Sequence, residues 1–185
     1  MHQRQEIREA VIAMLTKVVG GKYPTAAGSR VFAMRMNKLA ETQLPAIIVY
    51  TLSEDAAQFN EAPRELKRTC KLAIEAAIIA DSKAEDLLDQ LAEQIEAVMA
   101  ADVTLKKKAA ASILTATESE IFSDGKQDIG AVRLDYEVEY YTVQGESQRA
   151  DQLPIGDFAK AGVEWDTDQS IPDQIEAEDL NAIPQ

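Results

Sequence analysis

The sequence predicts an α+β domain in which two helices pack on one mostly antiparallel or mixed β-sheet, in the order α-β-β-β-α-β-β. Apolar residues recur at helical spacing in two segments, residues 4–18 and 82–99. Other segments alternate apolar and polar residues, most strictly at residues 132–143, VRLDYEVEYYTV. The elements end in a predicted strand hairpin, and this order is typical of helices packed on a single sheet.

The first helix is expected over residues 4–18, because its apolar residues form one stripe. The stripe consists of Ile7, Val11, Met14, Leu15 and Val18. Gly20 and Gly21 are expected to end this helix. The alternation in residues 29–36, SRVFAMRM, then predicts a strand.

A central strand covered on both faces is expected over residues 44–52, LPAIIVYTL, because this run is continuously apolar and β-branched. Residues 64–79 predict a long strand with one solvated face, since even positions from Leu66 to Ile78 are mostly apolar. The segment between them, SEDAAQFNEAPRE, is acidic and rich in turn residues, and we expect a long loop there.

The second helix is predicted to begin at Ser82, which forms a capping-box pattern with Glu85. Apolar residues follow at helical spacing, and the opposite face is acidic. A lysine-rich connector, residues 105–111, leads to two strands at residues 112–122 and from residue 129. The loop SDGKQD, with Asp-Gly as its turn signal, predicts that these strands form a hairpin.

Composition limits the classes of function. The chain has 32 acidic and 19 basic residues and a formal charge of -13, which is the opposite of what binding to a phosphate backbone requires. We therefore expect no sequence-specific nucleic acid partner. A single cysteine, Cys70, excludes a disulfide framework or a multi-cysteine zinc site within one chain. The polar N-terminus and the short apolar runs predict a soluble protein made in the cytoplasm, with no membrane partner.

No catalytic, cofactor or metal site is predicted. The only histidine, His2, lies at the terminus, where a ligand or catalytic base would lack rigid support. Gly20, Gly21 and Gly28 form none of the glycine-rich phosphate-binding motifs.

Three carboxylates, Asp135, Glu137 and Glu139, share one face of the last predicted strand. They form either an ordinary solvated face or a charged surface that lines a channel or meets a basic partner. Glu118 and Glu120 share a face of the neighbouring strand, and they would repel this row if they lay directly opposite.

The densest basic run in this acidic chain consists of Lys106, Lys107 and Lys108. It forms either a solvated loop or a surface that docks an acidic patch on a neighbouring subunit.

The sequence predicts two parts, a domain at residues 1–144 and an acidic C-terminal arm at residues 145–185. The arm has ten acidic and two basic residues, yet it keeps an apolar segment, LPIGDFAKAGVEW. We expect Phe158, Val163 and Trp165 to anchor the arm on a neighbour, because aromatic residues contribute strongly to interfaces. Packing on its own domain and disorder are the alternatives.

These elements resemble the tail terminator proteins of long-tailed bacteriophages, of the type represented by the minor tail protein U of lambda-like phages. The resemblance covers about residues 4–143 in order and spacing. It is carried by REAVIAMLTKV, LPAIIVYT, KRTCKLAIEAAI followed by SKAEDLLDQLAEQIEAVM, and VRLDYEVEYYTV.

The resemblance implies a structural virion protein, without enzymatic activity or cofactors, at the head-proximal end of the tail. It implies a homohexameric ring that caps the tail tube protein, stops tube polymerisation and offers a joining surface to the head-tail connector. DNA could then pass through the ring. From their shared face we hypothesise that Asp135, Glu137 and Glu139 line its lumen.

Two alternatives stay open. One is another ring component of the virion, such as a neck connector or a tail tube protein, which would polymerise alone into long tubes. The other is a small α+β enzyme or ligand-binding regulator, which would need a cleft containing acids with a perturbed pKa.

Overall fold

The computed structural model describes residues 2–33, 40–123 and 128–144. The elements follow the predicted order, with one short additional 3₁₀ helix. They are α1 (Gln3–Leu15), β1 (Val31–Ala33), η1 (Glu41–Gln43), β2 (Ala46–Glu61), β3 (Arg64–Ile79), α2 (Ala84–Ala101), β4 (Ala111–Ser123) and β5 (Asp128–Val143). The predicted α+β class is confirmed.

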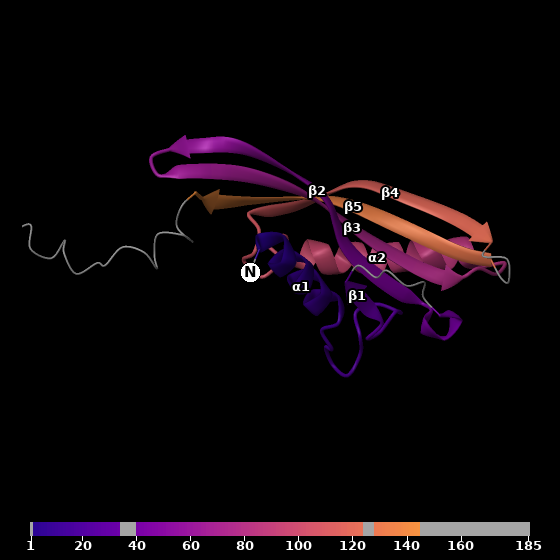
Figure 1. Cartoon of the computed structure of the whole chain (residues 1–185). Coiled ribbons are helices and arrows are strands. Elements are labelled where there is room, and N and C mark those ends of the chain that lie inside the picture. The colour runs from indigo at the N-terminus through magenta and orange to yellow at the C-terminus, as the bar shows by residue number, and fades with distance from the viewer. Residues whose placement is uncertain (1, 34–39, 124–127, 145–185) are drawn as a thin grey trace, which may run out of the picture. The chain divides into compact units, whose positions relative to one another are not determined.

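One five-stranded sheet organises the domain, in the strand order β1-β2-β3-β5-β4. β1 pairs with β2 in parallel, and the other neighbouring strands pair antiparallel. The sheet is therefore mixed and mostly antiparallel, as predicted. Both helices lie on the same side of the sheet (Figure 1).

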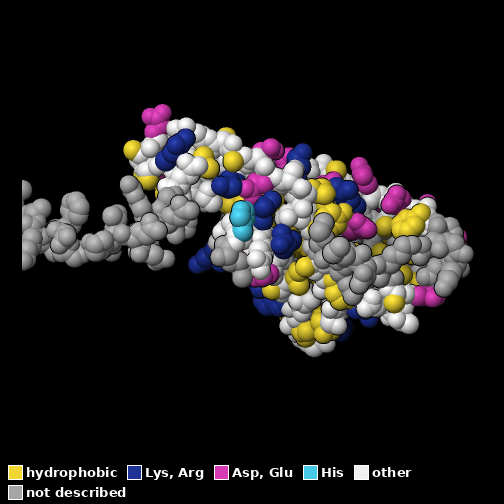
Figure 2. Space-filling view, viewed as in Figure 1, with side chains coloured by type: hydrophobic (Ala, Val, Ile, Leu, Met, Phe, Trp, Pro, Cys, Tyr) yellow, Lys and Arg dark blue, Asp and Glu magenta, His cyan; other side chains and the backbone are white. Residues whose placement is uncertain are grey.

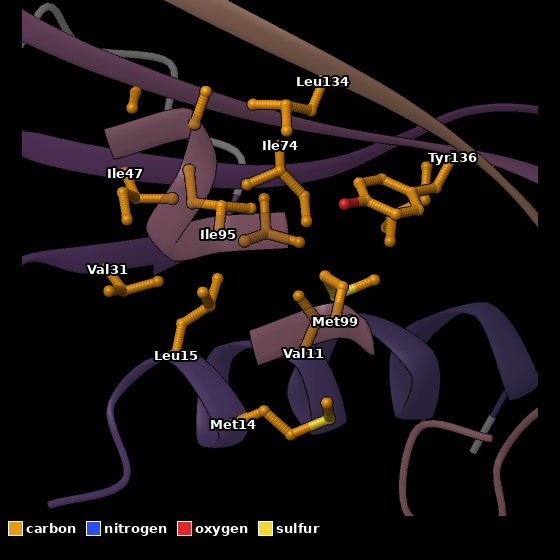
Figure 3. Packing of buried hydrophobic residues seen from close by; sticks show 14 of the residues in the cluster. Val11, Met14, Leu15, Val31, Ile47, Ile74, Ile95, Met99, Leu134 and Tyr136 are labelled. Atoms are coloured by element: carbon orange, nitrogen blue, oxygen red, sulfur yellow. The ribbon is translucent and has the colours of Figure 1, made fainter. Parts of the chain in front are cut away.

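The core lies between the helices and this face of the sheet. Alternate residues of β5 are buried, as the pattern in residues 132–143 predicts: Val132, Leu134, Tyr136, Val138 and Tyr140. They pack with β2, β3 and the apolar stripes of both helices (Figure 3). One strict alternation thus fixes which face of the sheet the helices cover.

α2 passes so close to β5 that a side chain at Gly130 would be tightly packed. A Cβ atom added at Gly130 would lie 3.2 Å from Cδ1 of Leu88 and 3.3 Å from Cγ1 of Ile78. We expect Gly130→Val to reduce the free energy of unfolding by about 1–3 kcal/mol, because it overpacks this contact. Denaturant unfolding measures the change. Ala116→Val, on an exposed position of β4, is the control and should change stability by less than about 0.5 kcal/mol. Equal effects of the two substitutions would contradict the close packing of α2 on β5.

The predicted long loop between the second and third strands is wrong. β2 continues to Glu61 and pairs with the start of β3 as far as Glu61 and Arg64, with irregularities at Thr51/Ser53 and Gln58/Asn60. Backbone pairing holds this hairpin, and residues 52–61 of β2 are almost all exposed. Apolar alternation is therefore not required there, and the sequence shows none.

Several predicted boundaries also need correction. α1 ends at Leu15 instead of residue 18, and the glycines instead form a turn closed by a bridge between Val19 and Lys22. α2 has no capping box at Ser82, because its N-cap is Lys83 and no side chain caps the helix.

The central strand is not covered on both faces as predicted. In β2, Ile47 and Val49 are buried on the helix side, but Tyr50 is only half-buried and Leu52 is exposed. Both described helices lie on the side of the sheet that Ile47 and Val49 face, opposite to Tyr50 (Figure 1). Residues 34–36 of the predicted strand and the Asp-Gly turn lie outside the described residues.

Candidate functional site

Three strands extend beyond the helices, and we call this part the blade. It consists of residues 55–61 of β2, 64–69 of β3 and 139–143 of β5, which pair side by side. Figure 1 shows the hairpin projecting past α1. Its last described backbone bond runs from the N–H of Gln144 to the carbonyl of Arg64, 2.8 Å away.

A cluster of polar side chains fixes the root of the blade to α1. The carboxylate of Glu54, whose side chain is 9% exposed, accepts hydrogen bonds from Arg68 and from the hydroxyl of Tyr140. Nε of Arg4, on α1, lies 3.5 Å from the same carboxylate. Arg68 also donates from Nε to Oγ1 of Thr142 at 2.9 Å. Glu54 thus joins β2, β3, β5 and the first helix.

The electrostatics of this cluster favour an ionised Glu54. Burial alone would raise the pKa of Glu54, but the hydrogen bonds from Tyr140 and Arg68 outweigh it and hold the pKa below its ordinary value. Burial, and then the hydrogen bond to Glu54, raise the pKa of Tyr140. The cluster is therefore a salt bridge with a neutral tyrosine donor at neutral pH.

The blade also presents an exposed aromatic pair. The rings of Phe59 and Tyr141 lie edge to face with their centroids 4.8 Å apart, and the residues are 60% and 43% exposed. Exposed aromatic side chains on a projecting element are typical of contact surfaces between proteins. The sequence did not predict this pair, because Phe59 lies in the segment expected to be a loop.

The acidic row of Asp135, Glu137 and Glu139 lies on the sheet face away from the helices, and cations from the same sheet partly neutralise it. Nε of Arg133 lies 2.8 Å from Oδ1 of Asp135, and Lys71 is the register partner of Glu137 on β3. Hydrogen bonds from Lys67, 2.6 Å away, and from Tyr141 lower the pKa of Glu139.

The second acidic row is placed so that the two do not repel directly. Glu118 pairs in register with Arg133, and Glu120 pairs with Ala131. The sequence alone could not give this register.

The lysine connector forms a tight turn, which we call the basic turn, residues 105–107. All three residues are left-handed, with φ values of 50°, 57° and 64° for Leu105, Lys106 and Lys107. Such a conformation costs about 1–2 kcal/mol per non-glycine residue, so the surroundings must hold it. The Leu105 side chain does this in part, because it is fully buried in the core.

Asp102 holds the other side of the basic turn. Its carboxylate accepts hydrogen bonds from the hydroxyl of Thr104 at 2.6 Å, the N–H of Thr104 at 3.1 Å and the N–H of Lys106 at 2.9 Å. These bonds, that of the Thr104 hydroxyl first, lower the pKa of Asp102. The turn is therefore built around an internal anion.

The three lysines have different environments. Nζ of Lys108 lies 2.7 Å from Glu6, and its carbonyl accepts a hydrogen bond from Gln3. Lys106 and Lys107 form no ion pair within the part of the chain that the structure describes. Figure 2 shows Lys and Arg side chains gathered beside the single histidine, at the start of α1.

Within residues 2–33, 40–123 and 128–144, no group of three or more His, Cys, Asp or Glu residues could hold a metal ion. None of the described helices is long and apolar enough to cross a membrane.

The single histidine and the single cysteine both have structural environments. His2 caps α1 by accepting a hydrogen bond from the N–H of Arg4. Burial raises the pKa of Cys70 to about 11, so its thiol is protonated at neutral pH. Phe158, Val163 and Trp165 lie outside the described residues.

The described surfaces include a projecting blade, a basic turn and an ordered row of charges. A family model described as phage minor tail protein U matches residues 2–140. The chain belongs to the phage minor tail protein U family, and its role is that of a structural component of a virion tail.

A chain in the solved structure of the virion of a native gene transfer agent particle is 14% identical. The match covers 73% of this chain and 94% of that chain, with a TM-score of 0.37. No curated protein matches the chain.

Proposed function

We propose that the protein is a tail terminator that acts without catalysis. Six copies form a ring on the last ring of the tail tube, stop its polymerisation and offer a surface to the head-tail connector. The protein then resides in the virion, at the head-proximal end of the tail. The observation that carries the proposal is the family match over residues 2–140.

The shape of the domain is compatible with a ring. A closed ring of identical subunits requires two different surfaces on each subunit, because its contacts are head-to-tail. Three distinct surfaces are the blade with Phe59 and Tyr141, the basic turn and the sheet face away from the two described helices. Partners of the ring would be the tail tube protein below it and the connector above it.

The acidic row supports a more specific proposal, in which Asp135, Glu137 and Glu139 face the lumen. Net negative charge there would discourage DNA from adhering as it passes. Lys67, Lys71 and Arg133 offset these three charges, so Glu75 and Glu118, the register partners of Arg133 on the same sheet face, would supply the remaining negative charge. A ring structure with these carboxylates outside the channel would contradict this placement.

Tube length provides the functional test. When the protein is added while its tail tube protein polymerises, tubes should become shorter as the ratio of terminator to tube protein rises, and one end should carry a cap in electron micrographs. If the protein alone forms long tubes, it is a tube protein instead. If tube length is independent of the added protein, the terminator proposal is wrong.

The arm is proposed to strengthen assembly. A chain ending at Gln144 should keep its fold, because the backbone hydrogen bond from Gln144 to Arg64 is retained. It should need a higher protein concentration than the full-length chain to form rings. Circular dichroism and molecular mass measure the two properties. Full-length Phe158→Ala/Trp165→Ala should weaken rings in the same direction, because it removes aromatic anchors. Loss of soluble folded protein after truncation would contradict this role, since it would place the arm in the core.

A further inference from the structure

We infer that the basic turn of one copy binds the exposed acidic face of α2 on the next copy, a contact that rests on the proposed ring assembly and specifies it. Lys106 and Lys107 supply the cations. The acidic face consists of Glu85, Asp86, Asp89, Glu93 and Glu96.

The acidic face is a charged surface without cations of its own. The 18 residues of α2 contain no lysine or arginine. All five carboxylates are exposed, and none takes part in an ion pair with another described residue. The opposite side of the helix is buried in the core, through Leu88, Leu91 and Ile95.

Only the carboxylates in the first turn of α2 stabilise the helix by themselves. Glu85 and Asp86 lie in the first turn, where the helix dipole favours negative charge. Asp89 and Glu93 lie beyond it, four residues apart, and like charges at that spacing repel each other. A basic partner would relieve this repulsion.

The basic turn complements this surface in charge and in rigidity. Strained left-handed residues are retained where the surroundings impose them, and they concentrate at functional sites. Here Asp102 and the buried side chain of Leu105 impose the conformation. Lys106 and Lys107 are thereby presented on an ordered backbone, which lowers the entropy cost of a contact.

The turn cannot bind most of the acidic face of its own chain. It follows the C-terminal end of α2, at Ala101, whereas Asp86 lies fifteen residues earlier in the helix, or about 22 Å at 1.5 Å per residue. A contact that uses the whole face therefore joins two copies. Because it uses two different surfaces, it is head-to-tail and can close into a ring.

Charge reversal tests the contact. In the turn variant, Lys106→Glu/Lys107→Glu, acidic side chains would face the acidic helix at every interface. In the helix variant, Asp89→Lys/Glu93→Lys, two lysines would replace the central carboxylates of the face and meet the lysines of the turn. Each variant alone should need at least about tenfold more protein to form rings than wild type. Lys17→Glu/Lys22→Glu changes the charge equally at exposed positions away from the turn, and it should assemble as wild type does.

Mixing the two variants gives the sharpest readout. An equimolar mixture should regain rings in which the variants alternate, because each acidic turn then meets the two lysines introduced on a helix variant and each basic turn meets an unchanged acidic face. Alternation closes only for an even number of subunits, so native mass spectrometry should show three copies of each variant in a hexamer. Recovery in the mixture also establishes that both variants fold.

The outcomes separate this contact from the terminator function. If the wild type forms rings and either variant assembles equally well, the proposed contact is wrong. If the mixture stays unassembled, the contact is also wrong. Both results would leave the terminator proposal standing. Wild-type protein that forms no ring, with or without tail tube protein, would overturn both.

Discussion

Replacing Glu54 with alanine is expected to lower the free energy of unfolding by about 3 kcal/mol, because breaking a buried ion pair leaves its partners uncompensated. Arg68 and the hydroxyl of Tyr140 would both lose their acceptor at the root of the blade. Glu54→Gln keeps an acceptor but removes the charge, and it should cost less, about 1–2 kcal/mol. Denaturant unfolding at neutral pH measures both changes.

Asp55→Ala is the matched control, because Asp55 is the exposed neighbour of Glu54. It should change stability by less than about 0.5 kcal/mol. Similar losses for Glu54→Ala and Asp55→Ala would show that the polar cluster does not stabilise the fold.

The same residue predicts part of the acid sensitivity of the protein. The pKa of Glu54 is lower in the folded protein than its ordinary value of 4.5, so on acidification the unfolded state takes up this proton first. The stabilisation by Glu54 is therefore complete above pH 4.5 and is lost as the pH falls through the lower folded-state pKa. The unfolding free energy of Glu54→Gln should fall less steeply below pH 4.5 than that of wild type. An identical acid slope would contradict this assignment.

Leu134→Ala is the second substitution with a large expected effect. Leu134 is fully buried on β5 and packs in the cluster shown in Figure 3. Truncating a buried leucine removes its transfer free energy and leaves a cavity, so we expect a loss of about 3 kcal/mol.

Ile113→Ala removes a comparable side chain from an exposed position on β4, where Ile113 is 64% exposed. It should change the free energy of unfolding by less than about 0.5 kcal/mol. A cost below about 1 kcal/mol for Leu134→Ala would contradict a close-packed core between the sheet and the helices.

Periodicity predicted the parts of the fold that bury one face. β3 begins and ends at the predicted residues, 64 and 79, and the alternating residues of β5 face the core. A register slip of one residue would expose all of these side chains, so the pattern specifies the pairing strongly. The helices were predicted for the same reason.

The blade and the basic turn could not be predicted in this way. Residues 55–61 of the blade are all exposed, so pairing between β2 and β3 holds this strand without an apolar pattern. The basic turn has left-handed residues without the glycine or asparagine that usually signals them. Its conformation depends on Asp102 and on a core position for Leu105.

Contacts between distant residues were also beyond the sequence. The cluster around Glu54 joins Arg4, Arg68 and Tyr140, which become neighbours only when the sheet forms. Similarly, Lys67 on β3 forms an ion pair with Glu139 on the neighbouring strand β5. The acidic row therefore carries less net charge than its spacing suggests.

The most direct test of the terminator function is the mass of the purified protein, measured alone and with preformed tubes of its tail tube protein. The account predicts one stable hexameric ring that binds tube ends and adds no further layers. Tubes extended by the protein, or tubes that bind none of it, would contradict the account.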